Sequence, residues 1–243
     1  MARVRKRRGQ QELQFSRRGG KRPGAGRPKK GKRASEPHKR RLAVKPSEPV
    51  HVTLRTVDGL PRLRTRSAYK AVREAAITML RHDSCRIVHL SIQRNHVHLL
   101  VEADDRMALA RGMQAFQISA AKHINAALGR RRGQVFADRY HPERITNRKQ
   151  ARHALAYVLN NWRRHREDRA PFAENWVIDP FSSGWAFEGW KELEDSPTLC
   201  KLRETYQPMP VWRPKSWLLS TGWRMYGLIG AREVPGPRTG ARH

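Results

Sequence analysis

The sequence predicts an α+β fold, in which helices cover an antiparallel sheet, and three observations support it. Strand-like segments of mixed apolar and polar residues occupy residues 50–57, 86–93 and 95–103. Longer segments with apolar residues at helical spacing occupy residues 66–82, 107–128 and 149–164. With a further strand or strand pair expected within residues 134–146, the order is strand, helix, strand, strand, helix, strand, helix. That order suits a sandwich of one sheet and its covering helices.

The first strand and the first helix are both amphipathic. Val50, Val52 and Leu54 share one face of the strand, because strand side chains alternate between faces. A turn at Asp58–Pro61 leads into the helix. The residues expected to face inward from that helix are Ala68, Val72, Ala75, Ala76 and Met79.

The second and third strands are expected to form a hairpin, because only Arg94 and Asn95 separate them and Asn tolerates a positive φ angle. In the third strand, His96 and His98 point to one face while the apolar residues Val97, Leu99 and Val101 point to the other. Two imidazoles on one face are close enough to share a metal ion, although the same spacing also occurs in ordinary exposed strands.

The longest helix is expected at residues 107–128, with Gly129 as its C-terminal stop. Its buried stripe is Leu109, Met113, Phe116, Ala120 and Ile124. The loop after it contains Arg130, Arg131 and Arg132, which predict either DNA-phosphate contacts or a solvated basic turn. Pro142 interrupts the strand region that follows, and Tyr140 is a second-choice nucleophile there.

The last predicted helix separates an apolar stripe from a polar side that carries Tyr157. The stripe consists of Ala151, Leu155, Val158, Leu159 and Trp162. His153, Asn161 and Arg164 share the side of Tyr157, at four residues before and at four and seven residues after it. A helical Tyr is more often a core or boundary aromatic, but its position opposite the stripe argues against burial in that core.

The charge of the chain indicates a nucleic-acid partner. Its 51 Lys and Arg against 21 acidic residues give a net charge of +30. No apolar run approaches the length of a membrane-spanning helix, and no secretory signal is visible. Cys85 and Cys200 form neither a disulfide framework nor a zinc pattern, so we expect a cytoplasmic location.

Three regions are predicted: a basic disordered tail at 1–46, a folded domain at 47–165 and a Trp-rich C-terminal segment at 166–243. In the tail, Gly26-Arg27-Pro28 with Lys29 and Lys30 partly matches a minor-groove AT-hook, or forms a nonspecific electrostatic arm. Six of the seven Trp lie beyond His165, which predicts short helices and loops packed on the domain. Some of these rings would alternatively stack on unpaired bases.

Residues 50–165 resemble the single-tyrosine HUH nuclease domain of small insertion-sequence transposases and REP-associated tyrosine transposases. A His-hydrophobic-His strand, a long helix, and a helix with one Tyr and an amide four residues on carry the resemblance. It implies a ferredoxin-like (RRM-like) sandwich in which His96, His98 and Asn161 bind a divalent cation, Mg²⁺ or Mn²⁺, and Tyr157 attacks DNA. Many relatives have Pro directly after that Asn, where this chain has Trp162.

The resemblance implies an enzyme that cleaves and rejoins single-stranded DNA through a 5′-phosphotyrosine and recognises DNA hairpins, in the bacterial cytoplasm and associated with the nucleoid. An ordinary tyrosine hydroxyl, with a pKa near 10, is a poor nucleophile and needs the help of a metal ion. The covalent link conserves the phosphoester, so no nucleotide cofactor is needed, and no nucleotide-binding P-loop is present. The alternatives are a rolling-circle replication initiator or relaxase, and a DNA-binding protein without catalysis. The sequence leaves open whether the protein is a monomer or a homodimer.

Overall fold

The structure, a computed structural model, describes residues 43–173, 175–196, 199 and 204–236. The predicted tail residues Arg27, Lys29 and Lys30, like Cys200, lie outside the described residues. The main elements are β1 (Val50–Arg55), α1 (Arg66–Met79), β2 (Cys85–Ile92), β3 (His96–Ala103), α2 (Arg106–Ala127), β4 (His141–Arg144) and α3 (Arg148–Arg164).

The four strands form one sheet in the order β2-β3-β1-β4, and each neighbouring pair is antiparallel. This order, with α1 and α2 as connections, is the predicted α+β sandwich of the ferredoxin-like type. The hairpin through Arg94 and Asn95 is confirmed, but Asn95 does not use a positive φ: Arg166 is the one non-glycine residue of the described part that does. Residues 134–146 contribute one strand, β4, in which Pro142 pairs with Val52 at the sheet edge, where a missing N–H is tolerated.

Side-chain caps explain where the three long helices begin. The side chains of Thr65, Asp105 and Asn147 each accept a hydrogen bond from a backbone N–H in the first turn of α1, α2 and α3. After α2, Gly129 has a φ of +68°, a left-handed conformation typical of a residue just past a helix end. The predicted stop at Gly129 is therefore confirmed, whereas α1 ends about one turn before the predicted residue 82.

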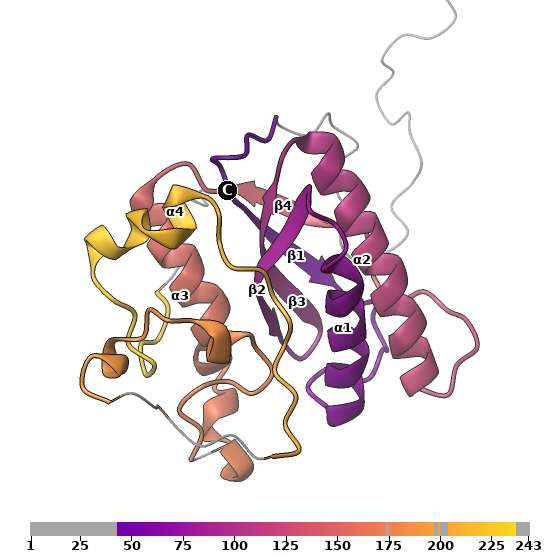
Figure 1. Cartoon of the computed structure of the whole chain (residues 1–243). Coiled ribbons are helices and arrows are strands. Elements are labelled where there is room, and N and C mark those ends of the chain that lie inside the picture. Colours follow the sequence, from indigo (N-terminus) through magenta and orange to yellow (C-terminus); the bar gives the residue numbers. More distant parts are fainter. Residues whose placement is uncertain (1–42, 174, 197–198, 200–203, 237–243) are drawn as a thin grey trace, which may run out of the picture. The chain divides into compact units, whose positions relative to one another are not determined.

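One hydrophobic core lies between the sheet and the helices α1 and α2 (Figure 1). The predicted inward residues of β1 and β3, Val52 and Leu99 among them, are fully buried in it. They pack against the predicted stripe of α2, including Phe116. Tyr140 is also buried in this core.

A second core lies on the opposite face of the sheet, under α3 (Figure 1). Leu155, Val158 and Leu159 of α3 pack there with Val88 of β2 and Leu100 of β3. The predicted apolar stripe of α3 is thus confirmed, and it packs on Leu100, which shares a face of β3 with His98.

The C-terminal segment completes this second core. Its short helices are η1 (Glu167–Arg169), η2 (Pro171–Ala173), η3 (Gly184–Ala186), η4 (Lys191–Leu193), α4 (Trp217–Ser220) and η5 (Gly222–Tyr226). Trp190 and Trp223 are buried against α3, as predicted for a segment rich in Trp. The buried carboxylate of Glu102 on β3 accepts hydrogen bonds from the backbone N–H groups of Lys215 and Ser216. No described helix is both long enough and apolar enough to span a membrane.

Candidate functional site

The strand β3 presents its two histidines on the face covered by α3. Val97 and Leu99 enter the α1/α2 core, so His96 and His98 point to the other side, as predicted. Their ring centroids lie 4.6 Å apart. His98 is buried, with 3% of its surface exposed, whereas His96 is partly exposed at the start of the strand.

Each histidine has its Nδ1 atom within hydrogen-bonding distance of a neighbouring side chain. His98 Nδ1 lies 3.1 Å from His51 Nε2 and 3.2 Å from Thr53 Oγ1. His96 Nδ1 lies 2.8 Å from Asn95 Oδ1. A hydrogen bond at one ring nitrogen fixes the orientation of the ring, so Nε2 is the nitrogen that would coordinate a metal ion in both residues.

Sequence reasoning missed His51 and Thr53. Thr53 pairs with His98 in the β1–β3 register, and His51 pairs with Leu100. The alternation that sends Val50, Val52 and Leu54 into the core sends these two polar residues to the opposite face. The alternation alone could have placed His51 and Thr53 on the face opposite the core. Only the pairing of β1 with β3 shows that this face also carries His98.

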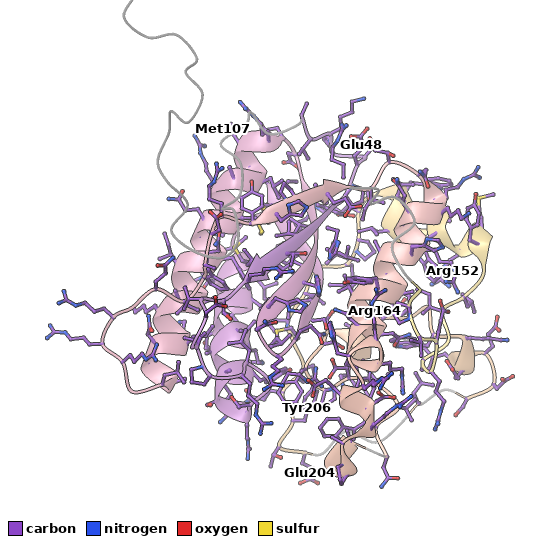
Figure 2. All side chains as sticks on the ribbon, turned by 180° about the vertical axis from the view of Figure 1, so that it is seen from behind. Glu48, Met107, Arg152, Arg164, Glu204 and Tyr206 are labelled. Atoms are coloured by element: carbon purple, nitrogen blue, oxygen red, sulfur yellow. The ribbon has the colours of Figure 1, made fainter. Side chains whose placement is uncertain are left out.

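Tyr157 of α3 lies directly against this histidine cluster. Its ring centroid is 5.2 Å from that of His98 and 5.7 Å from that of His51, and both contacts are edge to face. The guanidinium carbon of Arg164 lies 5.9 Å from the centroid of the Tyr157 ring. Figure 2 shows Arg164 and Arg152 toward the two ends of α3. His153, predicted on the same side as Tyr157, is exposed.

Asn161, one turn after Tyr157, is fully buried. Neither its Oδ1 nor its Nδ2 has a hydrogen-bond partner among the described residues. The preceding Asn160 is also buried, but its Nδ2 donates to the carbonyl oxygen of Gly230. An unsatisfied buried amide costs free energy, so the Asn161 side chain is a group for which a ligand would supply the missing partner.

These donors fit a small divalent cation. No group of three or more His, Cys, Asp or Glu side chains in the described part is placed to hold a metal ion. The set predicted from the sequence, His96, His98 and the Asn161 amide, contains only two residues of these types. Two imidazoles and one amide oxygen are acceptable ligands for Mn²⁺ and similar ions, and they leave coordination positions for phosphate and water.

The electrostatics of the site favour neutral imidazoles. Burial, together with the nearby His165 and Arg55, lowers the pKa of His96 to about 4. His165, whose ring centroid lies 5.6 Å from that of His96, also has a lowered pKa because of burial and the adjacent Arg164. A neutral imidazole is the form that binds a metal ion, so the environment of His96 suits a ligand at neutral pH.

The other predicted site residues lie elsewhere. Arg130, Arg131 and Arg132 are exposed in the loop after α2, which belongs to the opposite side of the sheet from α3 (Figure 1). Tyr140, the second-choice nucleophile, is buried in the α1/α2 core and does not join the histidine cluster.

The domain that carries this site is similar to known proteins. Residues 49–161 match the family model described as "Transposase IS200 like". Among solved structures, the chain is similar to one described as a REP-associated tyrosine transposase bound to a REP hairpin, with 19% identity and a TM-score of 0.49, over 62% of this chain and 84% of the other. A search of curated proteins found no match. The matched residues run from the start of β1 to Asn161 and include both histidines and Tyr157, so this domain is similar to the IS200-like transposase family.

Proposed function

We propose that the chain is a metal-dependent tyrosine transposase that cleaves and rejoins single-stranded DNA, with Tyr157 as the nucleophile. One observation carries the proposal: the Tyr157 ring lies 5.2 Å from that of His98, one helical turn before the buried and unsatisfied amide of Asn161. The match of residues 49–161 to the IS200-like transposase family supports the same proposal. DNA hairpins are the proposed substrate, and the bacterial cytoplasm, at the nucleoid, is the proposed place of action.

In the proposed reaction, the Tyr157 hydroxyl oxygen attacks the phosphorus atom of one phosphodiester. A bond forms between this oxygen and phosphorus while the bond from phosphorus to the 3′ oxygen breaks. The tyrosine proton is lost to water, and the leaving 3′ oxygen takes up a proton. The products are a 5′-phosphotyrosine and a free 3′-OH, and attack by a second 3′-OH rejoins DNA without a nucleotide cofactor.

His96, His98 and Asn161 are the residues that would hold the divalent cation, Mg²⁺ or Mn²⁺. When bound, such an ion polarises a phosphate oxygen and stabilises charge on the leaving oxygen. The protein orients the ligands: His51 and Thr53 fix the His98 ring, and the burial of Asn161 restricts its amide. Arg164, whose guanidinium carbon lies 5.9 Å from the centroid of the Tyr157 ring and whose Nη1 donates to the Gly236 carbonyl, would contact the DNA phosphate.

The test is the formation of a covalent complex with hairpin DNA that carries single-stranded flanks and a 3′-end label. The label marks the fragment that would remain on the tyrosine. With Mn²⁺ or Mg²⁺, we expect labelled protein on a denaturing gel, and no labelled protein for Tyr157→Phe. Tyr226→Phe, a change at an exposed tyrosine of η5, is the matched control and should react normally.

A second variant separates this enzyme from a DNA-binding protein without catalysis. His98→Ala should abolish cleavage while hairpin affinity is retained, because DNA affinity comes mainly from the basic surface. Tight DNA binding without an adduct from the wild-type protein, across many hairpins and both metals, would reject the catalytic proposal.

A further inference from the structure

A cavity of about 360 Å³ lies beside the candidate catalytic site and is not explained by the reaction above. Its lining residues are Arg62, Arg64, Arg94, Glu167, Trp176 and Phe181. They come from the β1–α1 loop, the β2–β3 turn, η1 and the C-terminal segment. The volume is at the lower end of the range for small-ligand pockets, roughly 300–1,000 Å³.

The cavity adjoins the His96 edge of the catalytic site. Arg94 precedes His96 by two residues. Glu167 lies two residues after His165, whose ring centroid is 5.6 Å from that of His96. The backbone N–H of Leu63 donates to the Arg94 carbonyl, so the arginine-bearing loop rests on the β2–β3 turn. A ligand in this cavity would therefore lie next to a phosphodiester at the metal site.

Arg64 lines the cavity and is held in place by several contacts within the protein. It donates two hydrogen bonds of 2.9 Å to the buried carboxylate of Asp179, and a third of 3.0 Å to the carbonyl oxygen of Ile92. Its guanidinium carbon also lies 4.6 Å from the centroid of the Phe181 ring. These contacts occupy Arg64 and one face of Phe181, so neither group is the main contact for a ligand.

The remaining groups match the parts of a nucleotide. Arg62 and Arg94 are exposed cations with no carboxylate partner among the described residues, and guanidinium groups suit phosphate. Trp176, supported by the buried ring of Trp162 at 6.4 Å, offers an aromatic surface for a base. The partly buried carboxylate of Glu167 has one oxygen, Oε2, 3.8 Å from Nε of Arg64, and its other oxygen can accept a hydrogen bond from an exocyclic amino group.

We propose that this cavity binds one unpaired nucleotide of the DNA strand next to the phosphodiester that Tyr157 attacks. Its phosphate lies against Arg62 and Arg94, its base stacks on Trp176, and Glu167 accepts a hydrogen bond from the amino group of the base. Cytosine, adenine and guanine carry such a group and thymine does not, so the cavity selects against thymine at this position. This inference rests on the proposed function, because it identifies the substrate strand by the reaction at Tyr157.

The experiment places 2-aminopurine, a fluorescent base, at each unpaired position of a hairpin substrate in turn. Stacking on a tryptophan quenches the fluorescence of this base, so we expect strong quenching at one position near the cleavage site. Trp176→Ala should remove the quenching and weaken binding roughly tenfold. Trp217→Ala, at an exposed tryptophan outside the cavity, is the matched control and should leave both unchanged.

Two further variants keep the test decisive if Trp176→Ala fails to fold. Arg94→Ala, at an exposed position, should weaken binding of the flanked hairpin but not of a hairpin without flanks. Arg81→Ala, at an exposed position outside the cavity, is its control. Glu167→Gln should remove the discrimination against thymine, since an amide also donates hydrogen bonds to thymine oxygens.

Adduct formation at Tyr157 is measured on the same samples, so the two proposals are judged separately. One result rejects the nucleotide cavity but keeps the transposase proposal. In that result the wild-type protein forms the adduct, but either no position is quenched or quenching is the same in the Trp176, Arg94 and Glu167 variants. If no adduct forms but quenching depends on Trp176, the catalytic proposal fails and the cavity remains a nucleotide site.

Discussion

The ring of Tyr157 on α3 lies edge to face against the ring of His98 on β3, with 5.2 Å between their centroids. Both residues belong to the same chain. The contact depends on the stripe of α3 that packs on Val88 and Leu100, because this packing fixes which side of the helix meets the histidines.

The residues that orient His98 should control metal affinity. Thr53→Val and His51→Phe each remove one group within hydrogen-bonding distance of His98 Nδ1, so the ring loses a fixed orientation. We expect the Mn²⁺ concentration for half-maximal cleavage to rise roughly 10- to 100-fold, with recovery at high Mn²⁺. Thr78→Val in α1, on the other side of the sheet, is the control. An unchanged metal dependence in both variants would contradict this role.

Two neighbouring asparagines should respond in opposite ways to the same change. Asn161→Leu removes a buried amide that has no hydrogen-bond partner among the described residues, so the free energy of unfolding without metal should stay equal or rise. Cleavage should be lost. Asn160→Leu removes a donor to Gly230 and should cost about 1–3 kcal/mol. Urea unfolding measures both, and equal destabilisation with cleavage retained in Asn161→Leu would argue against a ligand role.

The buried ion pair of Arg64 and Asp179 should be a large contributor to stability. Only 6% of the Arg64 side chain and none of that of Asp179 is exposed, so Asp179→Asn leaves a buried guanidinium with only Glu167, 3.8 Å away, as a carboxylate partner among the described residues. We expect a loss of about 3–5 kcal/mol in the free energy of unfolding. The exposed pair of Arg213 and Glu188 is the control, and Glu188→Gln should change stability by less than about 1 kcal/mol. Similar effects of the two changes would refute this account.

His89 should make the protein less stable in acid. Burial lowers its pKa from 6.5 to about 4 in the folded chain, where the ring lies 3.1 Å from the Ser183 hydroxyl. The unfolded chain therefore binds the proton more readily, and stability present above pH 6.5 is lost as pH falls toward 4. This loss amounts to about 3 kcal/mol.

Urea unfolding at pH 7 and at pH 4.5 measures this effect. His89→Gln should reduce the difference in unfolding free energy between the two pH values, whereas His82→Gln, at an exposed residue, should leave it unchanged. A difference that is the same in wild type and His89→Gln would show that other groups cause it.

Local patterns were sufficient to predict the sandwich and the strand face on which the two histidines lie. The alternation of Val50, Val52 and Leu54 and the stripe from Ala151 to Trp162 reflect burial on one face, which the sequence records directly. The same patterns put His96 and His98 on one strand face. The phase of α3 separated Tyr157 from the apolar stripe.

Residues joined by long-range pairing could not be predicted in this way. Thr53 reaches His98 because β1 pairs with β3, and the register of that pairing is not encoded in either strand alone. The burial of Asn161 depends on surrounding chain that the helix pattern does not reveal. The cavity beside His96 joins Arg62, Arg94 and Trp176 from three separate segments, so only the folded chain displays it.

The most direct measurement locates the covalent bond itself. The protein is incubated with hairpin DNA and Mn²⁺, the complex is treated with nuclease and protease, and mass spectrometry identifies the peptide that carries a nucleotide. The account predicts a phosphotyrosine link at Tyr157, in the peptide from α3, that disappears in His98→Ala. A link at Tyr140 or Tyr226, or cleavage of DNA with no nucleotide on any tyrosine, would contradict it.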